Sequence, residues 1–177
     1  MSTITKKICL LGDFNVGKTS LVRRFVEDKF DDRYLSTVGV KISRKSVTVK
    51  TDLELNQVNL LLWDLEGNTK FKSITPSYLK GASGSIIVAD LTRSVTLKNL
   101  DQHLKLFHEV NPQAVAIIAL NKADLLPSEK LAQLTENYSS QKFTDISNIY
   151  TTSARTGDNV GTMFELLARE ITLVPEP

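Results

Sequence analysis

One segment near the N-terminus limits the possible folds more than any other. Residues 12–19 read G-D-F-N-V-G-K-T and fit the pattern G-x-x-x-x-G-K-[ST] at every fixed position. The two glycines let the backbone curl so that successive N–H groups converge on phosphate oxygens, and the helix that follows adds the positive end of its dipole. We expect Lys18 to reach the outer phosphates and Thr19 to bind Mg²⁺. The alternative is a glycine turn with a surface lysine.

The surrounding sequence gives this segment the context it needs. An apolar run at 7–11 precedes it and predicts a buried strand, and apolar residues recur at helical spacing after it. Further along, 85–89 and 115–120 are continuous apolar runs typical of strands covered on both faces. Alternation between Val40 and Leu62, with a turn near Thr51, predicts an antiparallel hairpin. The chain should therefore be an α/β protein, with a mostly parallel sheet, helices on both faces and one antiparallel edge strand.

The region between the two apolar runs predicts one helix. Leu97, Leu100, Leu104 and Phe107 form a single helical stripe that ends at Asn111-Pro112. His103 and His108 fall on its polar face, and without a third ligand we interpret both as solvated side chains. Two more helices are expected, around Leu131 and Leu134 and from Val160 to Ile171.

Composition excludes several classes of function. The 177 residues correspond to one domain, and 22 basic against 20 acidic side chains leave a net charge of +2, too balanced to favour nucleic acid or an anionic membrane. The single cysteine, Cys9, cannot form a disulfide within the chain. The start lacks a secretory signal, no apolar run approaches the ~20 residues needed to span a bilayer, and the last residues, V-P-E-P, include no cysteine for prenylation. We expect a cytoplasmic protein with no lipid anchor visible.

Three further motifs follow the glycine-rich segment in order. They are W-D-L-E-G at 63–67, N-K-A-D at 121–124 and S-A-R at 153–155. With these motifs the chain resembles the Ras superfamily of small GTPases, and the Rab family most closely, from about residue 8 to residue 171. The resemblance implies one G domain over 1–177, with its core at about 7–172 and a six-stranded sheet. It also implies a Mg²⁺-dependent switch between GTP-bound and GDP-bound states.

The resemblance also assigns roles to individual residues. Asp124 would accept hydrogen bonds from guanine, Asn121 would tie the base loop to the phosphate loop, and the Ala154 amide would donate to guanine O6. Lys122 and Phe30 would cover the two faces of the base, and Thr37 would join the metal and the γ-phosphate in the GTP state; Phe30 as a core residue and Thr37 as a loop hydroxyl are the alternatives. The implied metal ligands are Thr19, Thr37 and Asp64, and the implied nucleotide-binding residues are Asp13, Phe14, Asn15, Val16, Gly17, Lys18, Thr19, Ser20, Phe30, Thr37, Gly67, Asn121, Lys122, Asp124, Ser153, Ala154 and Arg155.

Three positions depart from the family pattern around the reacting phosphate. Asn68 stands where a glutamine orients the attacking water, one methylene shorter, and a displacement of about 1 Å can cost ~100-fold in rate. Glu66 brings a carboxylate to the D-x-x-G motif, which repels the γ-phosphate unless it is turned away or paired. Phe14 crowds the route of an activator's arginine. Lys18, Thr37, Glu66 and Asn68 are the candidate catalytic residues, and we expect weak hydrolysis; the opposing hypothesis is that Glu66 orients water in place of glutamine.

The sequence favours a partner surface as well. The positions that match the aromatic cluster read by Rab effectors are Ile42, Trp63 and Tyr78, with Trp63 as a core residue being the alternative. A scaffold that binds guanine nucleotide without hydrolysing it is the second functional hypothesis. A phosphate-loop kinase or ATPase is disfavoured, because residues 121–124 match a guanine-binding motif.

Overall fold

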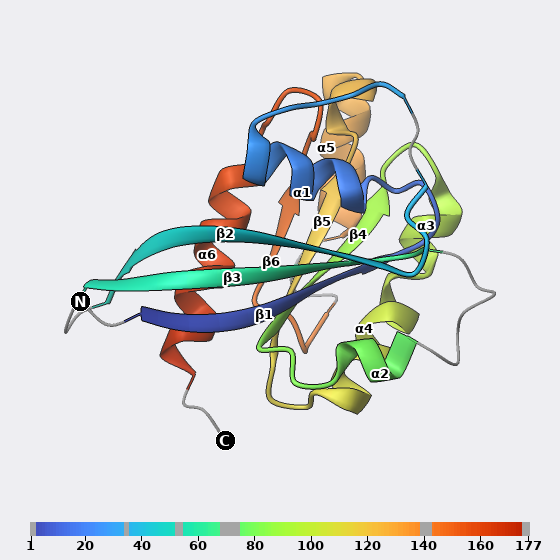
Figure 1. The fold of residues 1–177 in the computed structure, drawn as a ribbon. Helices are drawn as coiled ribbons and strands as arrows, with labels where there is room; N and C mark the ends of the chain where they lie inside the picture. Colours follow the sequence, from blue (N-terminus) through green and yellow to red (C-terminus); the bar gives the residue numbers. More distant parts are fainter. Residues whose placement is uncertain (1–2, 34–35, 52–54, 68–74, 139–142, 175–177) are drawn as a thin grey trace.

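A single sheet organises the molecule (Figure 1). The structure, a computed structural model, describes residues 3–33, 36–51, 55–67, 75–138 and 143–174. Within these residues a six-stranded sheet has the order β2-β3-β1-β4-β5-β6, and only β2 runs antiparallel to its neighbour. The strands are β1 (Thr3–Gly12), β2 (Val40–Lys50), β3 (Leu55–Leu65), β4 (Gly84–Asp90), β5 (Val115–Asn121) and β6 (Asn148–Thr151). The expected α/β fold with one antiparallel edge strand is confirmed.

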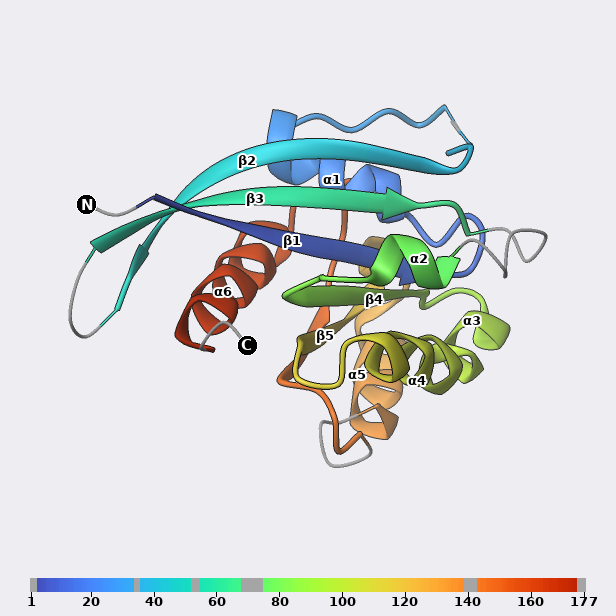
Figure 2. The ribbon, with the colours of Figure 1, turned by 60° about the horizontal axis from the view of Figure 1, so that its bottom comes forward.

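Helices cover both faces of the sheet (Figures 1 and 2). They are α1 (Lys18–Glu27), α2 (Thr75–Leu79), α3 (Ser94–Lys98), α4 (Leu100–Val110), α5 (Ser128–Asn137) and α6 (Val160–Leu173), with a 3₁₀ turn, η2, at Ala123–Leu125. Alternate residues of β1 point to opposite faces, so that Ile8 and Leu10 pack with α1 and α6 while Cys9 and Leu11 pack with α2 and α4. None of the helices in the described ranges is long and apolar enough to cross a membrane.

The helix expected after β4 is divided in two. Asn99 separates α3 from α4 with φ −85° and ψ −3°, and its N–H bonds to Val95 O and Leu97 O. Leu97 and Leu100, on either side of the break, are both buried against the same face of the sheet. The apolar stripe therefore continues through the break, which is why periodicity alone predicts one helix.

The parallel strands bring the sequence motifs to one edge of the sheet. The glycine-rich segment follows β1, Asp64 lies at the end of β3, and Asn121 ends β5. Gly12 makes the close approach between β1 and β4 possible: its φ is +150°, and a Cβ there would lie 2.3 Å from Val88 O. The segment can therefore leave β1 in this direction only with glycine at position 12.

Candidate nucleotide-binding site

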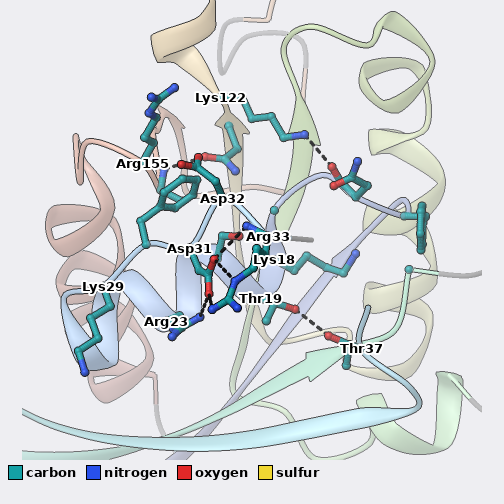
Figure 3. A pocket seen from close by; sticks show the side chains of 18 of the residues that line it. Lys18, Thr19, Arg23, Lys29, Asp31, Asp32, Arg33, Thr37, Lys122 and Arg155 are labelled. Atoms are coloured by element: carbon teal, nitrogen blue, oxygen red, sulfur yellow. Dashed lines mark hydrogen bonds and ion pairs between the residues drawn. The ribbon is translucent and has the colours of Figure 1, made fainter. Parts of the chain in front are cut away.

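A cavity of about 350 Å³ opens at the carboxyl ends of the strands (Figure 3). The expected residues that line it are Phe14, Asn15, Gly17, Lys18, Thr19, Ser20, Phe30, Thr37, Gly67, Asn121, Lys122, Asp124, Ala154 and Arg155. Three others, Asp13, Val16 and Ser153, lie behind this lining and contact it by hydrogen bonds. Asn68 falls outside the described residues.

Side chains hold the backbone carbonyls of the glycine-rich loop. Lys18 Nζ donates to Gly12 O at 2.9 Å and to Asp13 O at 2.8 Å. Lys122 Nζ donates to Asn15 O at 2.8 Å, and Asn121 Nδ2 donates to Val16 O at 3.0 Å. A loop whose carbonyl oxygens are bound in this way presents its N–H groups to an anion.

The same loop leaves space that a side chain would fill. Gly17 has φ +103°, and a Cβ on it would lie 2.3 Å from Asn121 Nδ2. Lys18 beside it is 6% exposed, and burial lowers the pKa of its ammonium group to about 8. A buried cation at the first turn of a helix, next to a glycine cradle, fits a phosphate group.

Three oxygen-bearing side chains converge next to Lys18. Thr19 Oγ1 donates to Asp64 Oδ2 at 2.5 Å and lies 2.7 Å from Thr37 Oγ1, which is 3.3 Å from the same carboxylate oxygen. Asp64 is 1% exposed, and its Oδ1 has no hydrogen-bond partner among the described residues. Burial raises the pKa of this carboxyl above its usual range. A buried carboxylate with an unsatisfied oxygen beside two hydroxyls is a donor set suited to Mg²⁺.

The opposite end of the cavity is assembled from the loops after β5 and β6. Asn121 joins this end to the phosphate loop, because its Oδ1 accepts from the Ala154 N–H at 3.3 Å while its Nδ2 holds Val16 O. Asp124 Oδ1 accepts from Ser153 Oγ at 2.7 Å. Asp124 keeps a second carboxylate oxygen for a ligand that can donate.

Two charged side chains at this end, Arg24 and Lys122, make contacts that the sequence motifs do not predict. Arg24, on α1, donates from Nε to Ala154 O at 2.9 Å and from Nη2 to Arg155 O at 2.6 Å. Lys122 Nζ lies 2.7 Å from Asp90 Oδ2. Burial acts to raise the pKa of Asp90, but hydrogen bonds from Lys122 and Thr92 outweigh it and hold that pKa below its usual range. Both contacts join segments far apart in the chain, so no local pattern predicts them.

The rim of the cavity carries charged residues that the sequence motifs do not include. The additional lining residues are Arg23, Lys29, Asp31, Asp32, Arg33, Leu65 and Leu125. Arg33 donates to Asp31 from its backbone N–H at 2.9 Å and from Nη2 at 3.0 Å, and these bonds lower the pKa of Asp31 to about 2. The only signal in the sequence is the charged run around Phe30, which by itself is typical of any solvated loop.

Two of the three departures from the family pattern, Glu66 and Phe14, fall within the described residues. Glu66 Oε2 accepts from the Gly39 N–H at 2.9 Å, and the Glu66 N–H donates to Gly39 O, also at 2.9 Å. The Glu66 carboxylate is therefore paired with the Gly39 N–H, and this pairing reduces its repulsion of a phosphate group. Phe14 lines the cavity and remains 46% exposed.

The expected partner residues lie close together, Ile42 and Trp63 on neighbouring strands and Tyr78 on α2. Ile42 is 48% exposed and pairs in register with Trp63, whose ring centroid lies 6.3 Å from that of Tyr78. Lys7 Nζ lies 3.9 Å from the centre of the Trp63 ring, and the indole N–H is buried with no hydrogen-bond partner among the described residues. Leu60 and Leu62 point to the opposite face and are fully buried.

The interpretation of His103 as a solvated side chain is wrong. Its Nε2 lies 2.8 Å from Asp13 Oδ1, and its side chain is only 22% exposed. His108 behaves as expected: its Nε2 lies 2.9 Å from Asp145 O in an exposed contact. The two histidines differ because His103 contacts the glycine-rich loop, ninety residues away in sequence, whereas His108 does not.

The fold and this site together define a phosphate-loop nucleotide-binding protein. The chain matches the profile of the Ras family over residues 7–173 and belongs to that family. It is 33% identical to the GTP-binding protein ypt5 of Schizosaccharomyces pombe over 174 residues, 97% of this chain and 80% of that protein. It is 34% identical to the Ras-related protein Rab-13 of Canis lupus familiaris, over 94% of this chain and 80% of that protein. It is 36% identical to the Ras-related protein SEC4 of Saccharomyces cerevisiae, over 93% of this chain and 74% of that protein. The resemblance to Rab proteins is confirmed, and proteins of this kind bind guanine nucleotide and Mg²⁺ in general and act as GTP/GDP switches.

Proposed function

We propose that this chain is a Rab-like, Mg²⁺-dependent guanine-nucleotide switch that hydrolyses GTP slowly. The observation that carries the proposal is the cavity itself, with a phosphate cradle and buried Lys18 at one end and Asp124 beside the Ala154 amide at the other. Lys18 would bind the β- and γ-phosphates, and Asp124 would accept from the guanine edge. Adenine lacks those donors, so its binding would leave the carboxylate unpaired, at a substantial cost in affinity.

Thr19, Thr37 and Asp64 would hold the metal ion. Their oxygens lie within 3.3 Å of one another, and the free Asp64 Oδ1 is available to accept from a metal-bound water. The ion would supply positive charge to the phosphate oxygens when bound. Thr37 would link the metal to the segment ahead of β2, so that the shape of this segment would respond to the nucleotide.

Slow hydrolysis follows from the residues around the reacting phosphate. Asn68 would place its amide short of the position from which a glutamine orients water. Glu66 would do little to replace it, because its Oε2 already accepts from Gly39. Phe14, half exposed at the cavity mouth, would obstruct an arginine supplied by an activating protein.

A second candidate function is a scaffold that signals through nucleotide occupancy alone. The reciprocal hydrogen bonds between Glu66 and Gly39 favour it, since they join the Thr37 segment to the end of β3 through protein groups. A surface held in this way would depend less on the γ-phosphate. In either case the partner would bind over Ile42, Trp63 and Tyr78, where an exposed aliphatic side chain adjoins two aromatic rings.

Competition between nucleotides tests the guanine assignment. We expect GTP and GDP, but not ATP, to displace a fluorescent GDP in the presence of Mg²⁺, with a preference of at least ~100-fold. D124A should weaken guanine binding by about the same factor and reduce the discrimination. Equal displacement by ATP and GTP would contradict the assignment.

A further inference from the structure

The β4–α4 segment binds the phosphate loop through three side chains. Arg93 Nη1 donates to Phe14 O at 2.8 Å. Asn99 Nδ2 donates to Asp13 Oδ2 at 2.7 Å, and His103 Nε2 lies 2.8 Å from Asp13 Oδ1. We call Arg93, Asn99 and His103 the α3–α4 clamp. The clamp binds Asp13 and Phe14, two consecutive loop residues to which neither Lys122 nor Asn121 donates a hydrogen bond.

The Asp13 carboxylate is the centre of this clamp. Both of its oxygens are engaged, one by an amide and one by an imidazole, and its side chain is 21% exposed. If a partly buried carboxylate loses a hydrogen-bond donor, it is left partly dehydrated with nothing to compensate, which is unfavourable. Hydrogen bonds to a charged carboxylate are also stronger than those between neutral groups. The contacts therefore resist movement of the loop.

The break between α3 and α4 makes the arrangement possible. Asn99 makes no side-chain capping bond to either helix, so its amide is available to Asp13. Buried Leu97 and Leu100 fix the backbone on both sides of it. His103 follows one helical turn later, on the same face, and reaches the second carboxylate oxygen.

We propose that the α3–α4 clamp positions the phosphate loop and sets the rate at which guanine nucleotide is released. The proposal rests on the proposed function. Release requires the loop to loosen its N–H groups from the phosphates. The clamp holds the Asp13 side chain and Phe14 O, while Lys18, Lys122 and Asn121 hold the carbonyls of residues 12, 13, 15 and 16. Its members act through the loop and are positioning residues.

The first test is the dissociation rate of a fluorescent GDP, chased with excess GDP in Mg²⁺. We expect N99A and H103A each to accelerate release about tenfold, the loss of one hydrogen bond to a charged group. H108A is the matched control, because it removes the other histidine of α4, whose contact is to Asp145 O, and should leave release unchanged within twofold. In a D13A background, N99A and H103A should add nothing further, since the group they hold is gone.

The second readout is rescue by a conservative variant, which a purely structural role would not give. H103Q keeps a side-chain N–H group that can donate to Asp13 Oδ1, and H103A removes it. Release from H103Q should therefore stay within about threefold of the unmodified protein, whereas H103A should accelerate it about tenfold. Equal acceleration in the two variants would mean that the contact with Asp13 is not what slows release.

The outcomes separate the clamp from the nucleotide assignment. Unchanged release in both N99A and H103A, or acceleration that persists fully in the D13A background, would overturn the clamp. If GDP does not bind at all, the proposed function fails, and amide hydrogen exchange over residues 12–17 of the free protein tests the clamp instead. Faster exchange in N99A than in H108A supports the clamp, and equal exchange overturns it.

Discussion

At the scale of single residues, the site relies on charges that are costly to bury. Lys18 is charged at neutral pH although burial lowers its pKa to about 8, and Asp64 keeps an unpaired oxygen in a fully enclosed position. The hydrogen bonds of the Lys18 ammonium group are to the neutral carbonyls of Gly12 and Asp13, and an anion would compensate its charge. A metal ion with its water would do the same for the Asp64 carboxylate. The charges that the fold buries here are therefore ones that a phosphate group and Mg²⁺ would compensate.

The pKa of Lys18 predicts how GDP affinity depends on pH. Phosphate stabilises the ammonium form, so the pKa is higher in the complex than in the free protein, and binding takes up a proton above about pH 8. GDP affinity should therefore be constant below pH 7.5 and fall as pH rises from 8 to 9.5, approaching tenfold per unit.

Calorimetry in buffers of different ionisation enthalpy measures this proton uptake. K18R is the matched control, because its guanidinium remains charged throughout the range and should give a flatter profile. Titration of the nucleotide itself is common to both proteins. Identical pH profiles for the two would contradict the role given to Lys18.

At the scale of elements, α6 supports the site through α1. Phe164 on α6 is fully buried, and its ring lies 4.2 Å from the ring of Phe25 on α1 with an interplanar angle of 8°. Because α1 begins at Lys18, this contact fixes the helix that follows the phosphate loop.

The contact predicts a large effect on stability. F164A removes a buried aromatic ring and leaves a cavity, so the free energy of unfolding in urea should fall by about 3–5 kcal/mol. L173A, near the exposed end of the same helix, should change it by less than about 0.5 kcal/mol. A loss below about 1 kcal/mol for F164A would mean that α6 is not a principal support of α1.

The elements also show which features the sequence could predict. The hairpin of β2 and β3 follows from apolar residues that alternate with polar ones over parts of both strands. Strands β4 and β5 follow from continuous apolar runs, which are typical of a sheet covered on both faces. The break at Asn99 was not predictable, because the buried stripe through Leu97 and Leu100 is continuous across it. Periodicity records which face is buried, and it does not record where the backbone stops being helical.

The same limit applies to the site. Its motif residues could be placed, since each lies at or just after the end of a strand and parallel strands end at one edge of the sheet. The contacts of Glu66 with Gly39 and of His103 with Asp13 depend on tertiary packing. In each pair, the sequence around one residue gives no indication of the other. The sequence therefore favours a solvated His103 and does not predict the pairing of Glu66 with Gly39.

At the scale of the whole molecule, the phosphate loop lies where all the supporting segments meet. The β4–α4 segment holds residues 13 and 14, the loop after β5 holds residues 15 and 16, and β3 carries the carboxylate beside Thr19. A ligand that bridges the cavity would thus contact elements from most of the chain. Saturating GDP with Mg²⁺ should raise the melting temperature, by an amount that grows with the logarithm of GDP concentration.

That stabilisation is measured by thermal unfolding at several GDP concentrations. The shift should be smaller in D64A, in which the metal ligand is lost, and absent for ATP at equal concentration. A melting temperature that does not change with GDP would contradict nucleotide binding by the folded chain.

Single-turnover hydrolysis of preloaded GTP tests the central claim most directly. GTP and GDP are followed by chromatography in Mg²⁺, for this protein, for N68Q and for canine Rab-13 under the same conditions. We predict that the unmodified chain hydrolyses GTP more slowly than Rab-13 and that N68Q accelerates it at least ~10-fold, by restoring the reach of the amide. Hydrolysis as fast as that of Rab-13, with no gain in N68Q, would show that the site positions water by another group, and the claim of a slow switch would be wrong.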